Sequence, residues 1–279
     1  MAPLLRPSPK RSSGGQGCPD IIEGKTGVTQ LATRDWAQAS ERLVEWIRDR
    51  AREAGARGGV FGVSGGIDSA LVLALAKRAF GSECLALILP CHSVQEDVDD
   101  ALELVRLFDC PHKVVDLSPA YDALLASLRF AGGECGSGSV TALAEANLKP
   151  RLRMAAWYYY ANLMNYLVLG GSNRAEIYVG YSTKYGDTGV DIMPLGHLTK
   201  SEVREMAAHL GVPKRIVERT PSAGLWKGQT DEDEMGITYR DLDNYLFGKP
   251  VPDDVRAKIE RRHRNSEHKR RMPPVPDVI

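Results

Sequence analysis

The feature that most constrains the fold is a short apolar run, residues 60–63, which leads through a glycine pair into a helix-like run beginning near Ser69. Such an order of strand, loop and helix points backbone amides at a ligand from the positive end of the helix. Gly65 and Gly66 have no Cβ, so the backbone there can adopt positive φ and approach an anion closely. The stretch Gly62-Val63-Ser64-Gly65-Gly66-Ile67-Asp68-Ser69 therefore predicts a pyrophosphate site.

Asp68 decides which kind of phosphate loop this is. A Walker A loop needs a lysine directly before its Ser or Thr, and this chain has Asp68 before Ser69 instead. A carboxylate beside phosphates is repulsive unless a cation bridges them, so Asp68 predicts a nucleotide that binds together with Mg²⁺. The alternative is an ordinary glycine turn in which Asp68 or Ser69 only caps the helix.

Helices alternate with continuously apolar strands in the first half of the chain. We expect helices over 35–54, 69–80, 96–108 and 119–128, and strands over 60–63, 84–89 and 113–117. Apolar strands that alternate with helices are typical of a parallel sheet covered on both sides. The prediction is an α/β fold with a doubly wound, mainly parallel sheet and helices on both faces, which binds its ligand at the carboxyl ends of the strands.

The remaining segments suggest one domain and a homodimer. Residues 1 to about 30 are rich in Pro, Ser and Gly without apolar periodicity, so we expect a disordered arm before a single domain over 31–279. A long helix is predicted over 142–169, and its wide apolar face fits either a buried helix or a dimer interface. Further helices are expected over 200–210, after Pro213, around 240–247 and over 253–264.

Charge and composition limit the partners. The 36 Lys and Arg residues balance the 36 Asp and Glu residues, which argues against nucleic acid or an anionic membrane as a partner. No apolar run approaches the roughly 18 residues of a membrane span, and no signal-peptide pattern begins the chain, so a cytoplasmic protein is expected. The cysteines are odd in number and form no Cys-x2-Cys pair, which disfavours a disulfide framework and a zinc site.

A second informative stretch, residues 170–191, follows a strand-like run and is rich in small residues. The Ser-Gly-Gly-x-Asp-Ser loop resembles that of the ATP pyrophosphatases, which cleave ATP to AMP and pyrophosphate. With residues 170–191, it is similar to ammonia-dependent NAD synthetase, which amidates nicotinic acid adenine dinucleotide (deamido-NAD). The similarity extends over roughly residues 36–274, through blocks at 147–154, 194–200, 221–225, 229–234 and 268–270.

The resemblance implies a role for individual residues. It places the ATP phosphates on the loop from Gly62 to Ser69, and Mg²⁺ on Asp68 and Glu176. Further ATP contacts fall on Gly171, Lys200 and Ser222, and deamido-NAD falls on Arg151, Lys184, Asp191, His268 and Lys269. These residue types suit the chemistry, because Arg and Lys bind phosphate oxygens and Mg²⁺ is held by one or two carboxylates.

Some of these features have a plainer interpretation when each is taken alone, and one departs from the family pattern. Glu176 would fit a solvated carboxylate at a helix end, and the basic run 261–271 would fit a solvated tail or an RNA-binding patch. Gly171 departs from the family, which usually has Thr there, so only its backbone and the neighbouring Ser172 are left to contact the nucleotide. Gln95 either approaches the adenylate or belongs to a polar cluster that caps a helix.

The implied reaction proceeds through an adenylate. The nicotinate carboxylate attacks the α-phosphate of ATP, pyrophosphate leaves into the Ser64 loop with Mg²⁺, and ammonia then displaces AMP. Catalysis is mostly positioning and charge neutralisation, with Asp68 and Lys200 as catalytic residues. Asp187 is the candidate base that deprotonates ammonium. Residues 221–234 are either a mobile lid or an exposed loop with an acidic helix start.

Two other functional classes and the nitrogen source complete the expectations. A tRNA-modifying relative would need a catalytic cysteine or an RNA-binding appendage. Neither is evident in the sequence, and Cys91, near a predicted strand end, is only a weak candidate for the cysteine. A non-catalytic nucleotide-binding module would be expected to lack Asp68 or Glu176, and both are present. Use of glutamine requires an activated cysteine on a separate domain, and the roughly 30 residues before the first helix leave no room for one. The chain is therefore expected to use free ammonia.

Overall fold

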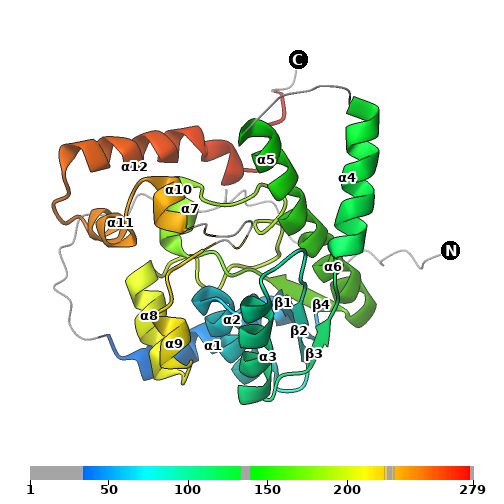
Figure 1. Ribbon diagram of the computed structural model, residues 1–279. Helices are drawn as coiled ribbons and strands as arrows, with labels where there is room; N and C mark the ends of the chain where they lie inside the picture. Colours follow the sequence, from blue (N-terminus) through cyan, green and yellow to red (C-terminus); the bar gives the residue numbers. More distant parts are fainter. Residues whose placement is uncertain (1–33, 133–138, 223, 225–227, 229, 277–279) are drawn as a thin grey trace. The chain divides into compact units, whose positions relative to one another are not determined.

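The structure is a computed structural model that describes residues 34–132, 139–222, 224, 228 and 230–276. A parallel sheet of four strands in the order β3-β2-β1-β4 forms its centre (Figure 1). The strands are β1 (Gly58–Gly62), β2 (Cys84–Ile88), β3 (His112–Val114) and β4 (Tyr166–Leu169). The predicted arm of residues 1–30 lies outside the described residues.

Every element predicted between residues 35 and 128 is present, as are the predicted helices after residue 200. The helices are α1 (Trp36–Glu53), α2 (Ile67–Phe80), α3 (Gln95–Leu107), α4 (Ser118–Gly132), α5 (Ser139–Ala146), α6 (Leu148–Met164), α7 (Arg174–Val179), α8 (Lys200–His209), α9 (Lys214–Val217), α10 (Asp231–Met235), α11 (Tyr239–Leu246) and α12 (Asp253–Asn265), with a 3₁₀ turn at Glu267–Lys269. Among the described residues, no helix has both the length and the apolarity that crossing a membrane requires.

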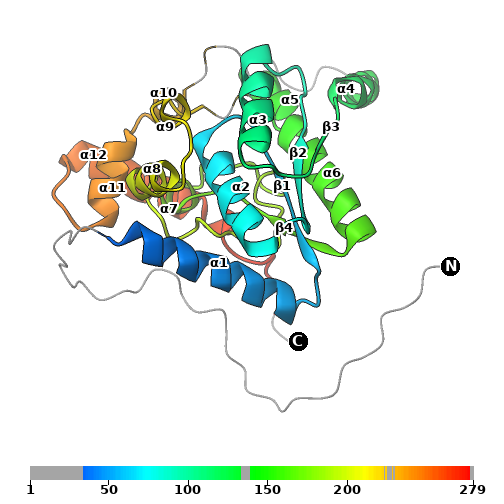
Figure 2. The same ribbon diagram turned by 90° about the horizontal axis from the view of Figure 1, so that it is seen from below.

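Both faces of the sheet are buried, because successive strand residues point to opposite sides. Phe61 of β1 packs into the larger core, which α1, α2, α3 and α8 complete. Its neighbour Val60 packs on the other face with Ala161 of α6. Figure 2 shows α2 and α3 on one side of the strands and α6 on the other. Burying one side chain of this size contributes about 1.5–3 kcal/mol to the free energy of folding. The prediction of a doubly wound α/β sheet with helices on both faces is confirmed.

The prediction of one long helix over residues 142–169 is wrong. The chain forms α5 and α6 there and then enters the sheet as β4. Helix α6 ends at Asn165, whose φ of 57° is left-handed and stops the helix. Val168 then pairs with Val60 in parallel register. Periodicity could not separate the two possibilities, because a short apolar run fits a buried strand as well as a buried helix.

The sheet reverses its direction of growth at β1. The chain adds β2 and β3 on one side of β1 and then returns to place β4 on the other. Such a reversal leaves a crevice at the carboxyl ends of the strands, where ligands bind in open α/β sheets. The loops after β1 and β4 meet there, since a Cβ on Gly171 would lie 3.8 Å from the Cβ of Asp68.

Four capped helices place polar side chains around this crevice. Asn173 and Thr199 form capping boxes with Glu176 and Glu202, and Thr230 and Thr238 cap α10 and α11. Each cap is worth roughly 1 kcal/mol and fixes the first turn of its helix. The four first turns carry Glu176, Lys200, Asp231 and Tyr239. A third apolar cluster, with members from α7, α10, α11 and α12, holds three of these helices together.

Candidate active site

The glycine loop after β1 is fixed by its own serines and by α3. Ser69 Oγ donates to the carbonyl of Gly66 (2.9 Å) and accepts from the amide of Ser64 (3.1 Å). Gly65 has a φ of 81°, and a Cβ there would lie 2.7 Å from the carbonyl oxygen of Asp97. Glycine is therefore required at residue 65 for conformation and for space. The loop lies at the start of α2, where a helix N-terminus favours phosphate.

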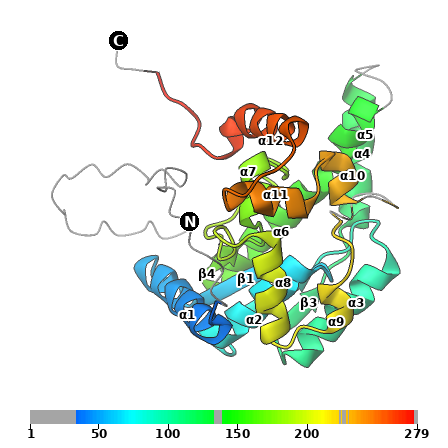
Figure 3. The same ribbon diagram turned by 90° about the vertical axis from the view of Figure 1, so that its left-hand side faces the viewer.

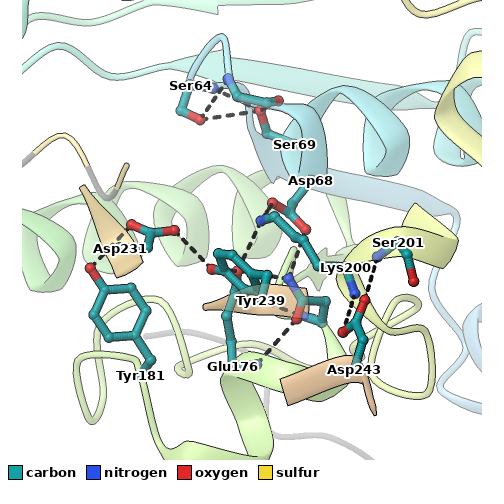
Figure 4. A network of polar contacts seen from close by, with 12 residues as sticks. Ser64, Asp68, Ser69, Glu176, Tyr181, Lys200, Ser201, Asp231, Tyr239 and Asp243 are labelled. Carbon is teal, nitrogen blue, oxygen red and sulfur yellow. Dashed lines mark hydrogen bonds and ion pairs between the residues drawn. The ribbon is translucent and has the colours of Figure 1, made fainter. Parts of the chain in front are cut away.

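Asp68, Glu176 and Lys200 form one buried cluster (Figure 4). The Nζ of Lys200 lies 2.6 Å from Asp68 Oδ2 and 3.2 Å from Glu176 Oε1, and the lysine side chain is 2% exposed. The Nδ2 of Asn173 donates to Asp68 Oδ1 (3.0 Å) and to Glu176 Oε1 (2.7 Å). The two carboxylates that the sequence assigned to Mg²⁺ are thus brought together, with a lysine between them.

Burial and charge set the protonation of this cluster. Burial raises the pKa of Glu176 to about 7, although Lys200 opposes the shift, and the negative charges of Asp68 and Asp231 add to it. Burial alone would lower the pKa of Lys200, but Asp68 and Glu176 outweigh this effect and raise it. Lys200 is therefore a full cation at neutral pH, facing carboxylates of larger total charge.

Three residues to which sequence reasoning gave no role, Tyr239, Asp231 and Tyr181, extend the cluster towards α10. The hydroxyl of Tyr239 lies 3.0 Å from Glu176 Oε1 and 2.8 Å from Asp231 Oδ2. The hydroxyl of Tyr181 donates to Asp231 Oδ1 (3.1 Å) and lies 2.8 Å from Glu234 Oε2. Asp231 falls in the matching block 229–234, so a signal existed for it, whereas Tyr239 had none beyond its place after a helix-capping threonine.

The donor set suits Mg²⁺ bound with a nucleotide. Among the described residues, no three acidic, His or Cys side chains group as metal ligands. Asp68 and Glu176 supply two hard oxygens, and Mg²⁺ commonly takes one or two carboxylates, with phosphates and water as its other ligands. A divalent cation would also offset the excess of carboxylate charge around Lys200. The residues present therefore fit the ion.

Of the other predicted ATP contacts, Gly171 lies beside the cluster. Gly171 faces Asp68 and Ser69, and a Cβ there would make ordinary contacts of 3.8 Å or more. The glycine is thus not forced by space, and the family's usual Thr would fit at Cβ. Ser172 is buried. Ser222 is exposed and accepts a hydrogen bond from the amide of Gly224 (3.1 Å).

Of the residues predicted to bind deamido-NAD, Arg151 and Lys184 contact each other although they are distant in sequence. Arg151 Nε donates to the carbonyl of Lys184 (3.3 Å). Lys269 Nζ donates to the carbonyls of Gly180 (2.7 Å) and Ser182 (2.6 Å), and His268 is exposed.

Asp191 and Asp187 both bind parts of the fold. Asp191 accepts from the amide of Val168 (2.8 Å) and the hydroxyl of Tyr158 (2.9 Å), which ties it to β4 and α6. Asp187 accepts from the amide of Thr183 (2.7 Å). Burial raises the pKa of Asp187, which makes its carboxylate a stronger base than an ordinary one. Its role as the base for ammonium stays a prediction.

The segment predicted as a lid lies partly outside the described residues. Its described ends are joined, because the amide of Asp231 donates to the carbonyl of Pro221 (3.1 Å). The acidic stretch that follows is α10, whose first turn carries four acidic residues. An acidic helix start, the alternative to a lid at this point of the sequence, is thus present.

We expect Glu176 to make the stability of the metal-free protein pH-dependent. Its pKa is raised from 4.5 to about 7 on folding. The folded state therefore binds the proton more tightly, and the free energy of unfolding falls as pH rises between these values, by on the order of 3 kcal/mol. Glu176→Gln removes this fall. Urea titrations of wild type and Glu176→Gln at pH 5 and pH 8 measure the effect. If the difference in unfolding free energy between the two proteins is the same at both pH values, the assignment is contradicted.

Comparison with known proteins shows which family the chain resembles. A model of the NAD synthase family matches residues 39–273. The NH(3)-dependent NAD(+) synthetase of Syntrophomonas wolfei is 52% identical over 233 residues, which cover 84% of this chain and 93% of the relative. That of Carboxydothermus hydrogenoformans is 47% identical over 242 residues, covering 87% and 98%.

Solved structures show the same similarity. The NMN synthetase from Francisella tularensis superposes with a TM-score of 0.82 at 41% identity, over 88% of this chain and all of the other. The NH3-dependent NAD synthetase from Campylobacter jejuni, in complex with nitrate, gives a TM-score of 0.71 at 28% identity with the same coverage. Matches of this extent, in sequence and in structure, show that the chain belongs to the NAD synthase family.

Proposed function

We propose that the cluster of Asp68, Glu176 and Lys200 is the catalytic centre of an ammonia-dependent NAD synthetase. The chain joins ammonia to deamido-NAD in an ATP-dependent reaction that gives NAD. One observation carries the assignment of the site: two carboxylates, from the first turns of α2 and α7, converge on one buried lysine beside the glycine loop.

Each part of the site has a task in this reaction. The amides of the glycine loop bind the pyrophosphate portion of ATP, and the Lys200 cation stabilises charge that develops on the α-phosphate as the nicotinate carboxylate attacks. Asp68 and Glu176 would hold Mg²⁺, which would supply positive charge near the phosphates when bound. Asp187 takes the proton of ammonium, and its burial favours that proton. The carboxylate attack expels pyrophosphate and leaves an acyl adenylate, and ammonia then attacks its carboxyl carbon, so that AMP leaves as the amide forms.

Arg151 should act on the dinucleotide rather than on ATP. Its side chain is exposed beside Lys184, so truncation removes a cation without opening a cavity. We expect Arg151→Ala to raise KM for deamido-NAD by about 10- to 150-fold, the value of one charge-assisted hydrogen bond, and KM for ATP by much less. Arg52→Ala, on the exposed face of α1, is the matched control. Equal changes in both KM values would contradict the division of roles.

We also propose that the protein is a homodimer that pairs through α4, α5 and α6. These helices expose apolar side chains that one copy leaves uncovered: Leu124, Leu128, Phe130, Val140, Leu143, Tyr159 and Leu163. Helices α4 and α5 each contact α6, and large exposed apolar side chains on neighbouring helices suit an interface. Light scattering at micromolar concentration should give twice the chain mass of 30.6 kDa, and a value equal to one chain would remove this proposal.

The use of ATP and an NAD precursor fits the cytoplasm, which we propose as the location of the protein.

The direct test is whether ATP cleavage depends on deamido-NAD. The purified chain is supplied with ATP, Mg²⁺ and ammonium chloride, and pyrophosphate is measured with and without deamido-NAD. Release that needs deamido-NAD supports the proposal, and release at the same rate without it contradicts the proposal.

A second candidate substrate follows from one comparison, because the Francisella structure is that of an NMN synthetase. The same amidation on nicotinic acid mononucleotide would give NMN. Measuring kcat/KM for the mononucleotide and for deamido-NAD decides between them: a higher value for the mononucleotide would favour the second candidate.

A further inference from the structure

Tyr239 contacts both Glu176 and Lys200 and connects them to Asp231 of α10. It is the first residue of α11 and is 1% exposed. Its hydroxyl lies between Glu176 Oε1 and Asp231 Oδ2. The centroid of its ring lies 4.7 Å from the Nζ of Lys200, within the range of a cation–π contact. One side chain thus contacts both Glu176 and Lys200 (Figure 4).

The contacts of Glu176 show what this hydroxyl adds. Oε1 lies within hydrogen-bond distance of Lys200 Nζ, Asn173 Nδ2 and the Tyr239 hydroxyl, whereas Oε2 accepts from the backbone amide of Asn173 at 3.3 Å. Asn173 belongs to the same helix start as Glu176, and Lys200 ends in a flexible ammonium. Tyr239 is therefore the rigid partner from outside α7 that fixes the rotation of the carboxylate.

Tyr239 is itself held at both ends by α10. Its backbone amide donates to Glu232 Oε1 (2.8 Å), and its hydroxyl lies 2.8 Å from Asp231. Its ring packs in the apolar cluster with Ala175 and Leu242. A phenol has few rotatable bonds, and this one is closely packed, so the position of its hydroxyl depends directly on the position of α10. Figure 3 shows α7, α10 and α11 gathered on the same side of the molecule.

From these contacts we infer that Tyr239, supported by Asp231, is a positioning residue for the metal-binding side of the site. Its hydroxyl orients Glu176 towards Asp68, and its ring holds Lys200 against both carboxylates. The inference rests on the proposed function only for what the cluster binds. The geometry predicts that losing the hydroxyl weakens metal binding, whereas the ring keeps the lysine in place.

Tyr239→Phe removes the hydroxyl alone. We expect the Mg²⁺ concentration for half-maximal turnover to rise by about 10- to 150-fold, the value of one hydrogen bond to a charged group. Calorimetry with a non-hydrolysable ATP analogue should show the same fold-loss in affinity for Mn²⁺ without any turnover. The matched control is Tyr245→Phe in the same helix. The Tyr245 hydroxyl contacts that of Tyr178 at 3.3 Å, away from the cluster, so this variant should leave both values unchanged.

A merely structural role would give a different pattern. It would lower the melting temperature and the active fraction without moving the half-saturating metal concentration. Asp231→Asn should weaken metal binding less than Tyr239→Phe, and the double variant should be no worse than Tyr239→Phe, because the two residues act in series. If Tyr239→Phe does not fold, Asp231→Asn alone must still shift metal affinity.

Metal affinity of Tyr239→Phe within twofold of wild type, or an equal loss in Tyr245→Phe, would overturn the inference. Failure of the proposed function is separate from this result. It would appear as wild-type protein that cleaves no ATP in response to deamido-NAD, and calorimetry of metal binding would still test Tyr239.

Discussion

Replacement of Asp68 by Asn is expected to keep the fold and to lower kcat by about 10²- to 10³-fold or more, the scale for removing one preorganised electrostatic group. Asp68 uses one oxygen for Lys200 and the other for Asn173. An amide has only one oxygen, so its NH₂ must face either the ammonium of Lys200 or the NH₂ of Asn173. The substitution thus removes a negative charge and also sets a donor against a donor.

Pyrophosphate release at saturating Mg²⁺ measures this effect, and circular dichroism checks the fold. Asp254→Asn is the matched control, because Asp254 is exposed on α12 and pairs only weakly with Lys258 at 3.7 Å. Turnover of Asp68→Asn at the wild-type rate would remove Asp68 from the metal site.

Lys200→Met should abolish turnover and destabilise the metal-free protein. The substitution leaves Asp68 and Glu176 close together and largely buried without their cation. Removing one partner of a buried ion pair costs about 3–5 kcal/mol. We further expect Mg²⁺ to raise the melting temperature of the variant more than that of wild type, because the ion replaces the lost positive charge between the carboxylates.

Thermal unfolding with and without Mg²⁺ tests this second prediction. Lys214→Met serves as control, since Lys214 is highly exposed and lies 3.6 Å from Glu218. If Lys200→Met melted at the wild-type temperature without metal, the buried ion pair would contribute nothing to stability. The placement of Lys200 as the cation of the site would then be wrong.

The parts of the site that sequence predicted best are those set by local rules. The Gly65 turn needs positive φ, and strand, turn and helix follow one another directly, so loop and fold class could be inferred together. The end of α6 could not, because apolar residues at 167–169 suit a helix as well as a strand. Pairing with β1, a contact distant in sequence, makes these residues a strand.

Side-chain partners were harder to infer than side-chain types. The sequence assigned Lys200 to ATP and Asp68 with Glu176 to a metal, but nothing local predicts that these three side chains bond to one another. Tyr239 was missed for the same reason, since a buried tyrosine after a capping threonine is normally just core. Its role follows from where α7 and α11 place their first turns, which is a property of the tertiary fold.

One alternative from the sequence is weakened by the structure. Cys91 was the candidate nucleophile of a tRNA-modifying enzyme, and it is buried. Burial raises the pKa of its thiol, although Arg153 and Lys149 oppose the shift. A catalytic cysteine needs a lowered pKa and access to substrate, so Cys91 fits a structural thiol.

The measurement that tests the central claim most directly is NAD formation from either nitrogen source. The purified chain is given deamido-NAD, ATP and Mg²⁺ with ammonium chloride or with ammonia-free glutamine. With ammonium, we predict equal amounts of NAD, AMP and pyrophosphate, at a rate that rises with pH in step with free NH₃. Comparable NAD formation from glutamine by the chain alone, or ammonium-dependent ATP cleavage without NAD, would contradict the claim.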